Sequence, residues 1–117
     1  MPPRMPLVLL LLVASAAACA TAARLPAVHQ EDVTRGAERF PGLTQADLVE
    51  GRTLYAGKCG SCHVLPAPAS RAPTEWAEHV ALMKRRAHLD DRQLLLIDRY
   101  LITMASSASA GGRSAQP

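Results

Sequence analysis

The feature that most constrains this chain is a five-residue motif with two cysteines three positions apart and a histidine directly after them: Cys59-Gly60-Ser61-Cys62-His63. Cysteine and histidine side chains bind metals and react as nucleophiles, and three of them lie close together here. A metal or cofactor bound to them would constrain the local backbone. Within the 117 residues, the folded unit is expected to span roughly 65–75, a size at which an apolar core alone is marginal. A unit this small usually needs a disulfide, a metal or a cofactor.

The spacing of the motif suits covalent attachment of a haem. Each cysteine can add to one of the two vinyl groups, and the following histidine is then held beneath the ring, where a neutral imidazole binds iron. The chain has only one Trp, one Phe and two Tyr, so aromatic side chains can fill little of a core. We therefore predict one covalent haem c held by Cys59 and Cys62, with His63 as an axial ligand.

Three other interpretations of the two cysteines are open. A thioredoxin-like dithiol needs a βαβ setting, which the sequence pattern does not predict. A zinc site would need two further ligands, for which His79 and His88 are the candidates. A disulfide would close a very small loop and stabilise little. An export signal and a helix leading into the motif favour the haem.

The chain divides into four regions. Residues 1–18 have the features of an export signal, with Arg4, an apolar run and small residues before a cleavage site. Residues 19–42 are polar without a sustained period and are predicted to be a tether, partly ordered near Phe40. Residues 43–104 carry the helical periodicity and form the predicted domain. Residues 105–117 are rich in Ser, Ala and Gly and are predicted to be a disordered tail.

Three helices and no strands are predicted for the domain, which makes the fold class all-α. The first helix begins at Thr44, where Asp47 completes a capping box, and runs into the motif with Leu48, Tyr55 and Cys59 near one face. A glycine in the middle of that helix, Gly51, indicates close approach of another backbone.

Residues 64–73 contain three prolines and predict an extended loop. A second helix is expected over residues 74–87, with Trp76, His79, Val80 and Met83 on one face. A capping box of Asp90 and Gln93 opens a third helix to residue 104, and its broad apolar stripe predicts deep burial.

Residues 50–63, EGRTLYAGKCGSCH, resemble the amino-terminal helix and haem site of class I cytochromes c, and residues 89–101 resemble the closing helix of that family. The resemblance covers about residues 44–104 and lacks the longer middle section of the family, which makes it closest to the compact monohaem members. It implies a small three-helix cytochrome c-like fold around one haem. It further implies that the first and last helices cross, with Gly51 at the contact and Tyr55 near Tyr100.

The second axial position of the iron decides what the haem does. Met83 is the preferred ligand, because it precedes the closing helix, where class I cytochromes c place their methionine, and shares a face with Trp76, which could pack along the haem. His79, one turn earlier, is the alternative sixth ligand, and His88 and Met104 are lesser candidates. Methionine ligation raises the reduction potential, a second histidine lowers it, and an empty position would suit ligand binding.

Several polar groups are expected to support the haem. The carbonyl of Pro66 or Pro68 is the candidate acceptor for the second N–H of His63, following the family and the usual environment of a metal-bound histidine. Candidate cations for pairing with the haem propionates are Arg71, Lys84 and Arg85. A basic rim is expected to steer an acidic redox partner and consists of Lys58, Lys84, Arg85 and Arg86. The net charge of +3 gives no case for nucleic-acid binding.

The third cysteine, Cys19, follows Ala16-Ala17-Ala18, which resembles a bacterial lipobox with Ala in place of the usual Leu. Lipidation would make Cys19 the amino terminus and anchor the exported protein to a membrane. Ordinary cleavage after Ala18 or Ala20, or an uncleaved anchor over residues 7–23, are the alternatives.

These features together predict a periplasmic or membrane-associated single-electron carrier. No catalytic triad, carboxylate pair or phosphate-binding loop is present in the sequence, so the chain is not expected to be an enzyme by itself. Two alternatives are a haem-bearing subunit of a larger periplasmic oxidoreductase, and a haem sensor or gas-binding protein with a labile sixth ligand.

Overall fold

The computed structural model describes residues 24–62 and 64–113, and the side chains of 24–62 and 64–107. All regular structure in these residues is helical, which confirms the all-α class. The four α-helices are α2 (Gln30–Ala37), α3 (Gln45–Leu54), α4 (Pro73–Met83) and α5 (Asp91–Arg113). The last three are the helices predicted for the domain, and α2 is an additional helix in the segment predicted to be a tether. Two short elements complete the fold, a π-helical turn η1 (Tyr55–Cys59) and a 3-10 turn η2 (Pro68–Ser70).

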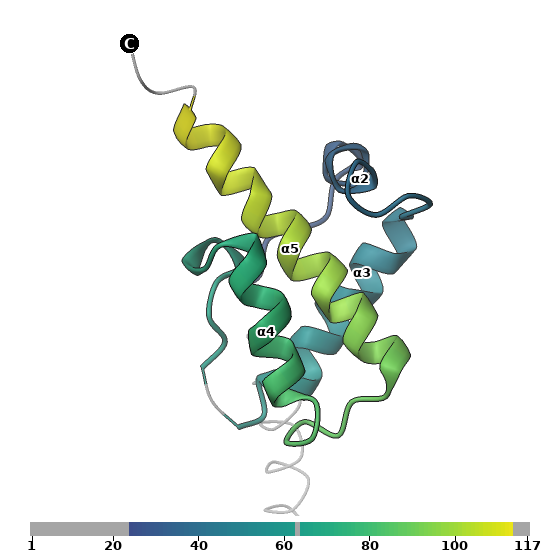
Figure 1. Cartoon of the computed structure of the whole chain (residues 1–117), viewed down its shortest axis with the longest axis vertical. Helices are drawn as coiled ribbons and strands as arrows, with labels where there is room; N and C mark the ends of the chain where they lie inside the picture. Colours follow the sequence, from purple (N-terminus) through teal and green to yellow (C-terminus); the bar gives the residue numbers. More distant parts are fainter. Residues whose placement is uncertain (1–23, 63, 114–117) are drawn as a thin grey trace, which may run out of the picture.

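The centre of the fold is the crossing of α3 and α5 (Figure 1). The predicted capping boxes are present at the start of both helices: Thr44 and Asp47 exchange hydrogen bonds of 3.0 and 3.1 Å, and Asp90 and Gln93 exchange bonds of 3.2 and 2.8 Å. Side-chain and backbone hydrogen bonds from Thr44 hold the pKa of Asp47 below its ordinary value. The sequence therefore determines where each of the two crossing helices begins.

Gly51 lies at the crossing, as expected. A Cβ atom at this position would be 2.2 Å from the backbone oxygen of Leu96 and 2.9 Å from Cβ of Tyr100. The ring of Tyr55 lies 6.5 Å from that of Tyr100, and both side chains are buried. The helix that carries the two cysteines is therefore fixed directly to α5.

Helix α4 lies along the other side of α5 and buries Trp76 and Val80 against it. Pro73 occupies its first turn, where its missing N–H costs nothing. The helix ends at Met83 instead of residue 87, because residues 84–88 form turns in which His88 has a φ of 52°. The backbone N–H of Leu89 closes this turn on the carbonyl of Lys84 at 3.0 Å.

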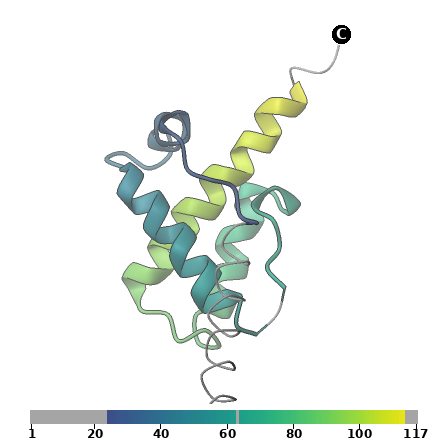
Figure 2. The ribbon, with the colours of Figure 1, turned by 180° about the vertical axis from the view of Figure 1, so that it is seen from behind.

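Residues 24–42, expected to belong to a tether, are instead packed on the domain in this structure. Helix α2 rests on α5, with Gly36 placed so close that a Cβ atom would be 2.8 Å from Oγ1 of Thr103. Residues 24–28, which we call the strap, run beside α3 and pass across α5 on the face shown in Figure 2. Leu25 of the strap is 6% exposed and belongs to the core. Buried area at Leu25 and in α2 offsets the entropy of ordering this segment.

The disordered tail was predicted to begin at residue 105, which is also too early in the sequence. Helix α5 continues to Arg113, and Ala105 is buried in the core. Residues 114–117, the end of the expected tail, lie outside the described residues. None of the helices in the described ranges 24–62 and 64–113 is long and apolar enough to cross a membrane.

Candidate functional site

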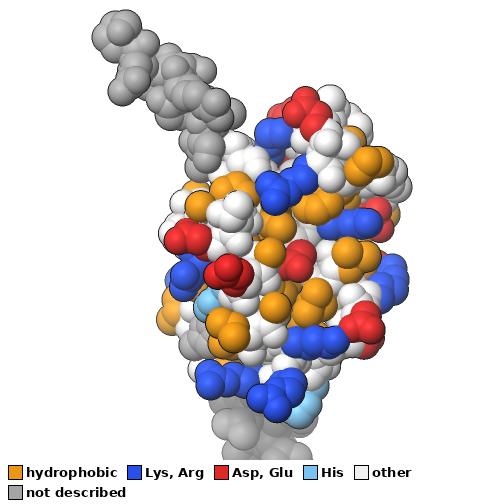
Figure 3. Space-filling model, in the orientation of Figure 1, with side chains coloured by type: hydrophobic (Ala, Val, Ile, Leu, Met, Phe, Trp, Pro, Cys, Tyr) orange, Lys and Arg blue, Asp and Glu red, His pale blue; other side chains and the backbone are white. Residues whose placement is uncertain are grey.

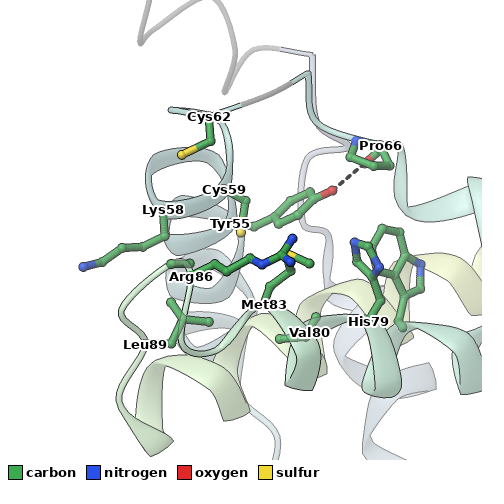
Figure 4. A pocket seen from close by; sticks show the side chains of 12 residues that line it. Tyr55, Lys58, Cys59, Cys62, Pro66, His79, Val80, Met83, Arg86 and Leu89 are labelled. Atoms are coloured by element: carbon green, nitrogen blue, oxygen red, sulfur yellow. Dashed lines mark hydrogen bonds between the residues drawn. The ribbon is translucent and has the colours of Figure 1, made fainter.

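A partly open pocket of about 220 Å³ lies between η1 and α4 (Figure 4). The chain segments around it are η1 with the following turn, the start of the proline loop, one face of α4 and the turn before α5. Most of its lining is apolar or aromatic, and its twelve residues are Tyr55, Lys58, Cys59, Cys62, Pro66, Trp76, His79, Val80, Met83, Arg86, Ala87 and Leu89. Both described motif cysteines and both leading candidates for the sixth ligand therefore share one pocket.

Cys59 and Cys62 carry free thiols, the first half-buried and the second exposed. Burial raises the pKa of the Cys59 thiol, and the negative charge of an ionised Cys62 acts in the same direction. The structure thus offers one sheltered and one solvent-facing sulfur at the pocket. His63 and Cys19, predicted to bind iron and a lipid, lie outside the described residues.

Helix α4 presents Met83, His79 and Trp76 on the face predicted for them. Met83 and His79 both line the pocket and are partly buried, so the structure brings both candidate ligands to one place. Trp76 is 0% exposed, and its indole N–H donates to the carbonyl of Pro68 at 2.8 Å. The Trp76 ring also meets His79 in an edge-on contact with a centroid distance of 5.7 Å. Trp76 therefore joins the proline loop to the helix that carries the candidate ligands.

Both proline carbonyls considered as partners of His63 already accept hydrogen bonds. The hydroxyl of Tyr55 donates to Pro66 at 2.7 Å (Figure 4), and Trp76 donates to Pro68. A carbonyl oxygen has a second lone pair, so neither is closed to a further donor. Burial raises the pKa of the Tyr55 phenol, which keeps it a donor at neutral pH. These bonds fix the loop that follows the motif.

The three cations expected to pair with the haem propionates are not among the residues that line the main pocket. Lys84 forms an ion pair with Asp91, and Arg71 stacks on Trp76 with its guanidinium carbon 5.6 Å from the ring centroid. Arg85 lines a shallower neighbouring hollow together with Leu82, Met83 and Arg86. Lys58 and Arg86 line the main pocket.

Two contributions to the site were not identified from the sequence. Arg86 was grouped with the rim only, because the predicted helix ran past it, whereas the observed turn directs it to the pocket. The hydrogen bond from the Tyr55 hydroxyl to the carbonyl of Pro66 joins residues eleven positions apart, and no local sequence pattern predicts it.

The described side chains do not supply an alternative metal centre. Within residues 24–62 and 64–107, no group of three His, Cys, Asp or Glu is placed to hold a metal ion. His79 and His88 therefore do not join the cysteines in a zinc site formed by described residues.

Comparison with known proteins adds no family to these observations. No family model, curated protein or solved structure matches this chain.

Proposed function

We propose that this protein is a single-electron carrier with one covalently bound haem c. The observation that carries the proposal is the shared pocket, in which the two thiols of a haem-attachment motif lie with the thioether of Met83. The crossing of α3 and α5 at Gly51 supports it further, because the resemblance to class I cytochromes c implies that arrangement.

The pocket suits a flat, mainly apolar group with one edge in water. Its lining is mostly apolar, it is partly open to solvent, and the side chain of Cys62 in its lining is exposed. Its volume of about 220 Å³ is below the roughly 300–1,000 Å³ of sites that enclose a ligand. A group as large as haem therefore needs its edge outside, or some movement of Arg86 and Met83 at the wall.

Each part of the chain has a distinct role in this proposal. Cys59 and Cys62 would hold the haem through thioether bonds, and His63 and Met83 would bind its iron, with His79 as the alternative sixth ligand. The buried side chains of Leu89, Val80 and Trp76 would exclude water from the inner edge of the haem. A dry environment favours the oxidation state of the iron in which the site carries less charge. The haem supplies the reversible one-electron change of its iron.

The proposed partner is a redox protein with an acidic docking patch, met in the periplasm or at the outer face of a membrane. Lys and Arg side chains gather at the end of the molecule where α4 passes into α5 (Figure 3). Of the expected rim, Lys84 is neutralised by Asp91, which leaves Lys58, Arg85 and Arg86. Leu82, which lines a hollow with Arg85 and Arg86, is 72% exposed and offers an apolar contact beside these cations.

The test is the absorption spectrum of the full-length protein, produced with haem-maturation factors, in oxidised and reduced states. Met83→Ala is expected to abolish the Met-to-ferric-iron charge-transfer band and to lower the reduction potential, because a thioether favours ferrous iron. His79→Ala is the matched control from the same helix face and should leave the band in place.

The opposite pattern, with the band unaffected by Met83→Ala, would show that the methionine is not the ligand. Loss of low-spin character in His79→Ala alone would assign the position to His79. Wild-type protein without covalent haem would refute the proposed function as a whole.

A further inference from the structure

We infer that Arg86 binds a carboxylate of the group held in the pocket, which under the proposed function is a haem propionate. The inference rests on that function for the identity of the ligand. Its basis is the position of Arg86 relative to every other cation around the pocket.

The other cations near the pocket either contact another side chain or are directed away from the pocket. Lys84 pairs with Asp91, and Arg71 lies over the ring of Trp76. Arg85 contributes to the neighbouring hollow and not to the pocket. Lys58 lines the pocket with its stem, but its ammonium group points away from it (Figure 4).

Arg86, in contrast, extends across the pocket from the turn after α4, beside Met83 and Tyr55 (Figure 4). It borders both hollows together with Met83, so the two side chains form the wall between them. Within the described part of the chain, no carboxylate forms an ion pair with Arg86. Arg86 is exposed, so without a ligand its guanidinium is hydrated, and it has no described protein carboxylate to release before it binds an anion at the pocket.

The backbone of the turn holds Arg86 in this position. The N–H of Ala87 donates to the carbonyl of Met83 at 2.9 Å, and the N–H of Leu89 donates to that of Lys84 at 3.0 Å. Both Ala87 and Leu89 also line the pocket. Arg86 is thus presented by a turn that is itself part of the pocket wall.

The chemistry of this arrangement selects a flat apolar ligand that carries an acidic group at its exposed edge. A guanidinium binds a carboxylate through two parallel N–H···O bonds, which a lysine cannot reproduce. Haem has this composition, with an apolar ring and two carboxylate arms. The pocket is then selective for the orientation that brings one arm to Arg86.

The first experiment compares the redox equilibrium of the haem-loaded full-length protein in four forms: wild type, Arg86→Gln, Arg86→Lys and Arg85→Gln. An unpaired carboxylate beside the haem disfavours reduction, so Arg86→Gln should lower the equilibrium constant for reduction against a reference couple about threefold or more. Arg85→Gln removes an equal charge from the adjacent position, which does not line the pocket, and should change the constant little. Arg86→Lys should fall between.

The second experiment separates a carboxylate contact from a general effect of charge. The full-length chain without haem is titrated with metal-free protoporphyrin IX and with its dimethyl ester, and binding is followed by porphyrin fluorescence. Arg86→Gln should weaken binding of the diacid about tenfold, the worth of a charge-assisted hydrogen bond, and leave the ester unchanged. Arg85→Gln should bind both porphyrins as wild type does.

Equal behaviour of Arg86→Gln and Arg85→Gln in both experiments would overturn the inference while leaving covalent haem in place. Equal loss of diacid and ester binding would also overturn it, because it would assign a purely structural role to Arg86. Absence of covalent haem from matured wild type would instead refute the proposed function, and the porphyrin titration would still decide whether Arg86 selects a carboxylate.

Discussion

At the scale of single residues, Gly51 is a position at which the fold leaves no room for a side chain. The backbone oxygen of Leu96 lies where a Cβ would have to be, and a backbone atom cannot rotate away as a side chain can. Gly51→Ala is therefore expected to destabilise the protein by about 3 kcal/mol or more. Urea unfolding followed by far-UV circular dichroism measures the loss.

Gly57→Ala is the matched control for this substitution. Gly57 lies in η1, the π-helical turn that directly follows α3, and a Cβ there would meet nothing within 4 Å. Its replacement should be neutral or stabilising by up to about 1 kcal/mol, because alanine loses less entropy on folding. Equal destabilisation by both substitutions would show that the close crossing of α3 and α5 is not what Gly51 provides.

Asp98 is a residue expected to lower the stability of the domain as the pH rises. Burial raises its pKa from the ordinary value of 3.8 to about 6, and its Oδ1 atom is buried without a described hydrogen-bond partner. The folded state therefore favours the protonated acid. The resulting stability is complete below pH 3.8 and is lost as the pH rises through about 6.

Asp98→Asn is expected to remove this dependence and to stabilise the protein above pH 7 relative to wild type. Because Asp98 is partly exposed, the effect is discounted to about 1 kcal/mol. Denaturant midpoints between pH 4 and pH 8 measure it. Asp91→Asn is the control of opposite sign, since the pKa of Asp91 is lowered by its bond to Lys84; parallel pH curves for wild type and Asp98→Asn would contradict the argument.

At the scale of elements, the strap is held to the helices by hydrogen bonds to its backbone carbonyls. Arg52 of α3 donates to Pro26 and to Leu25, both at 3.0 Å, and the hydroxyl of Tyr100 donates to Pro26 at 3.2 Å. Arg52→Ala should release the strap, with faster amide exchange in residues 24–28 and little change in α4. The expected loss of stability is about 1–2 kcal/mol, the value of hydrogen bonds from a charged donor.

Amide hydrogen exchange read by mass spectrometry tests this prediction segment by segment. Arg52→Lys keeps the charge but cannot reach two carbonyls at once, so its strap should exchange at an intermediate rate. Uniformly faster exchange in all helices would mean that Arg52 supports the whole fold instead of the strap.

The elements that could be predicted are those with local signals. The capping residues Thr44 and Asp90 predicted the starts of α3 and α5, because the hydrogen bonds that open these helices join residues only three positions apart. Helix α2 was missed because its buried side consists of Asp32, Val33 and Gly36, which have no apolar period. The end of α4 was missed because His88 takes the positive φ that a glycine would have signalled.

At the scale of the whole molecule, the sequence predicted which side chains would lie together at the candidate site, but not which partner each cation would have. Spacing placed the cysteines together and put Met83 and His79 on one face, which the structure confirms. The roles of the cations could not be predicted, since they depend on which partner each one finds across the fold. Lys84 pairs with Asp91, seven residues away, whereas Arg86 lines the pocket.

The strap also limits how far the domain could travel from a membrane. A free tether over the twenty-four positions 19–42 would have a contour length of roughly 80 Å at full extension. With the chain already bound to the domain at Leu25, a lipid on Cys19 would be connected through the few intervening residues, about 20 Å at most. If Cys19 carries a lipid, so short a connection would confine the protein to a layer next to the bilayer, where it would search for partners in two dimensions and meet those whose redox centres lie near the lipid headgroups.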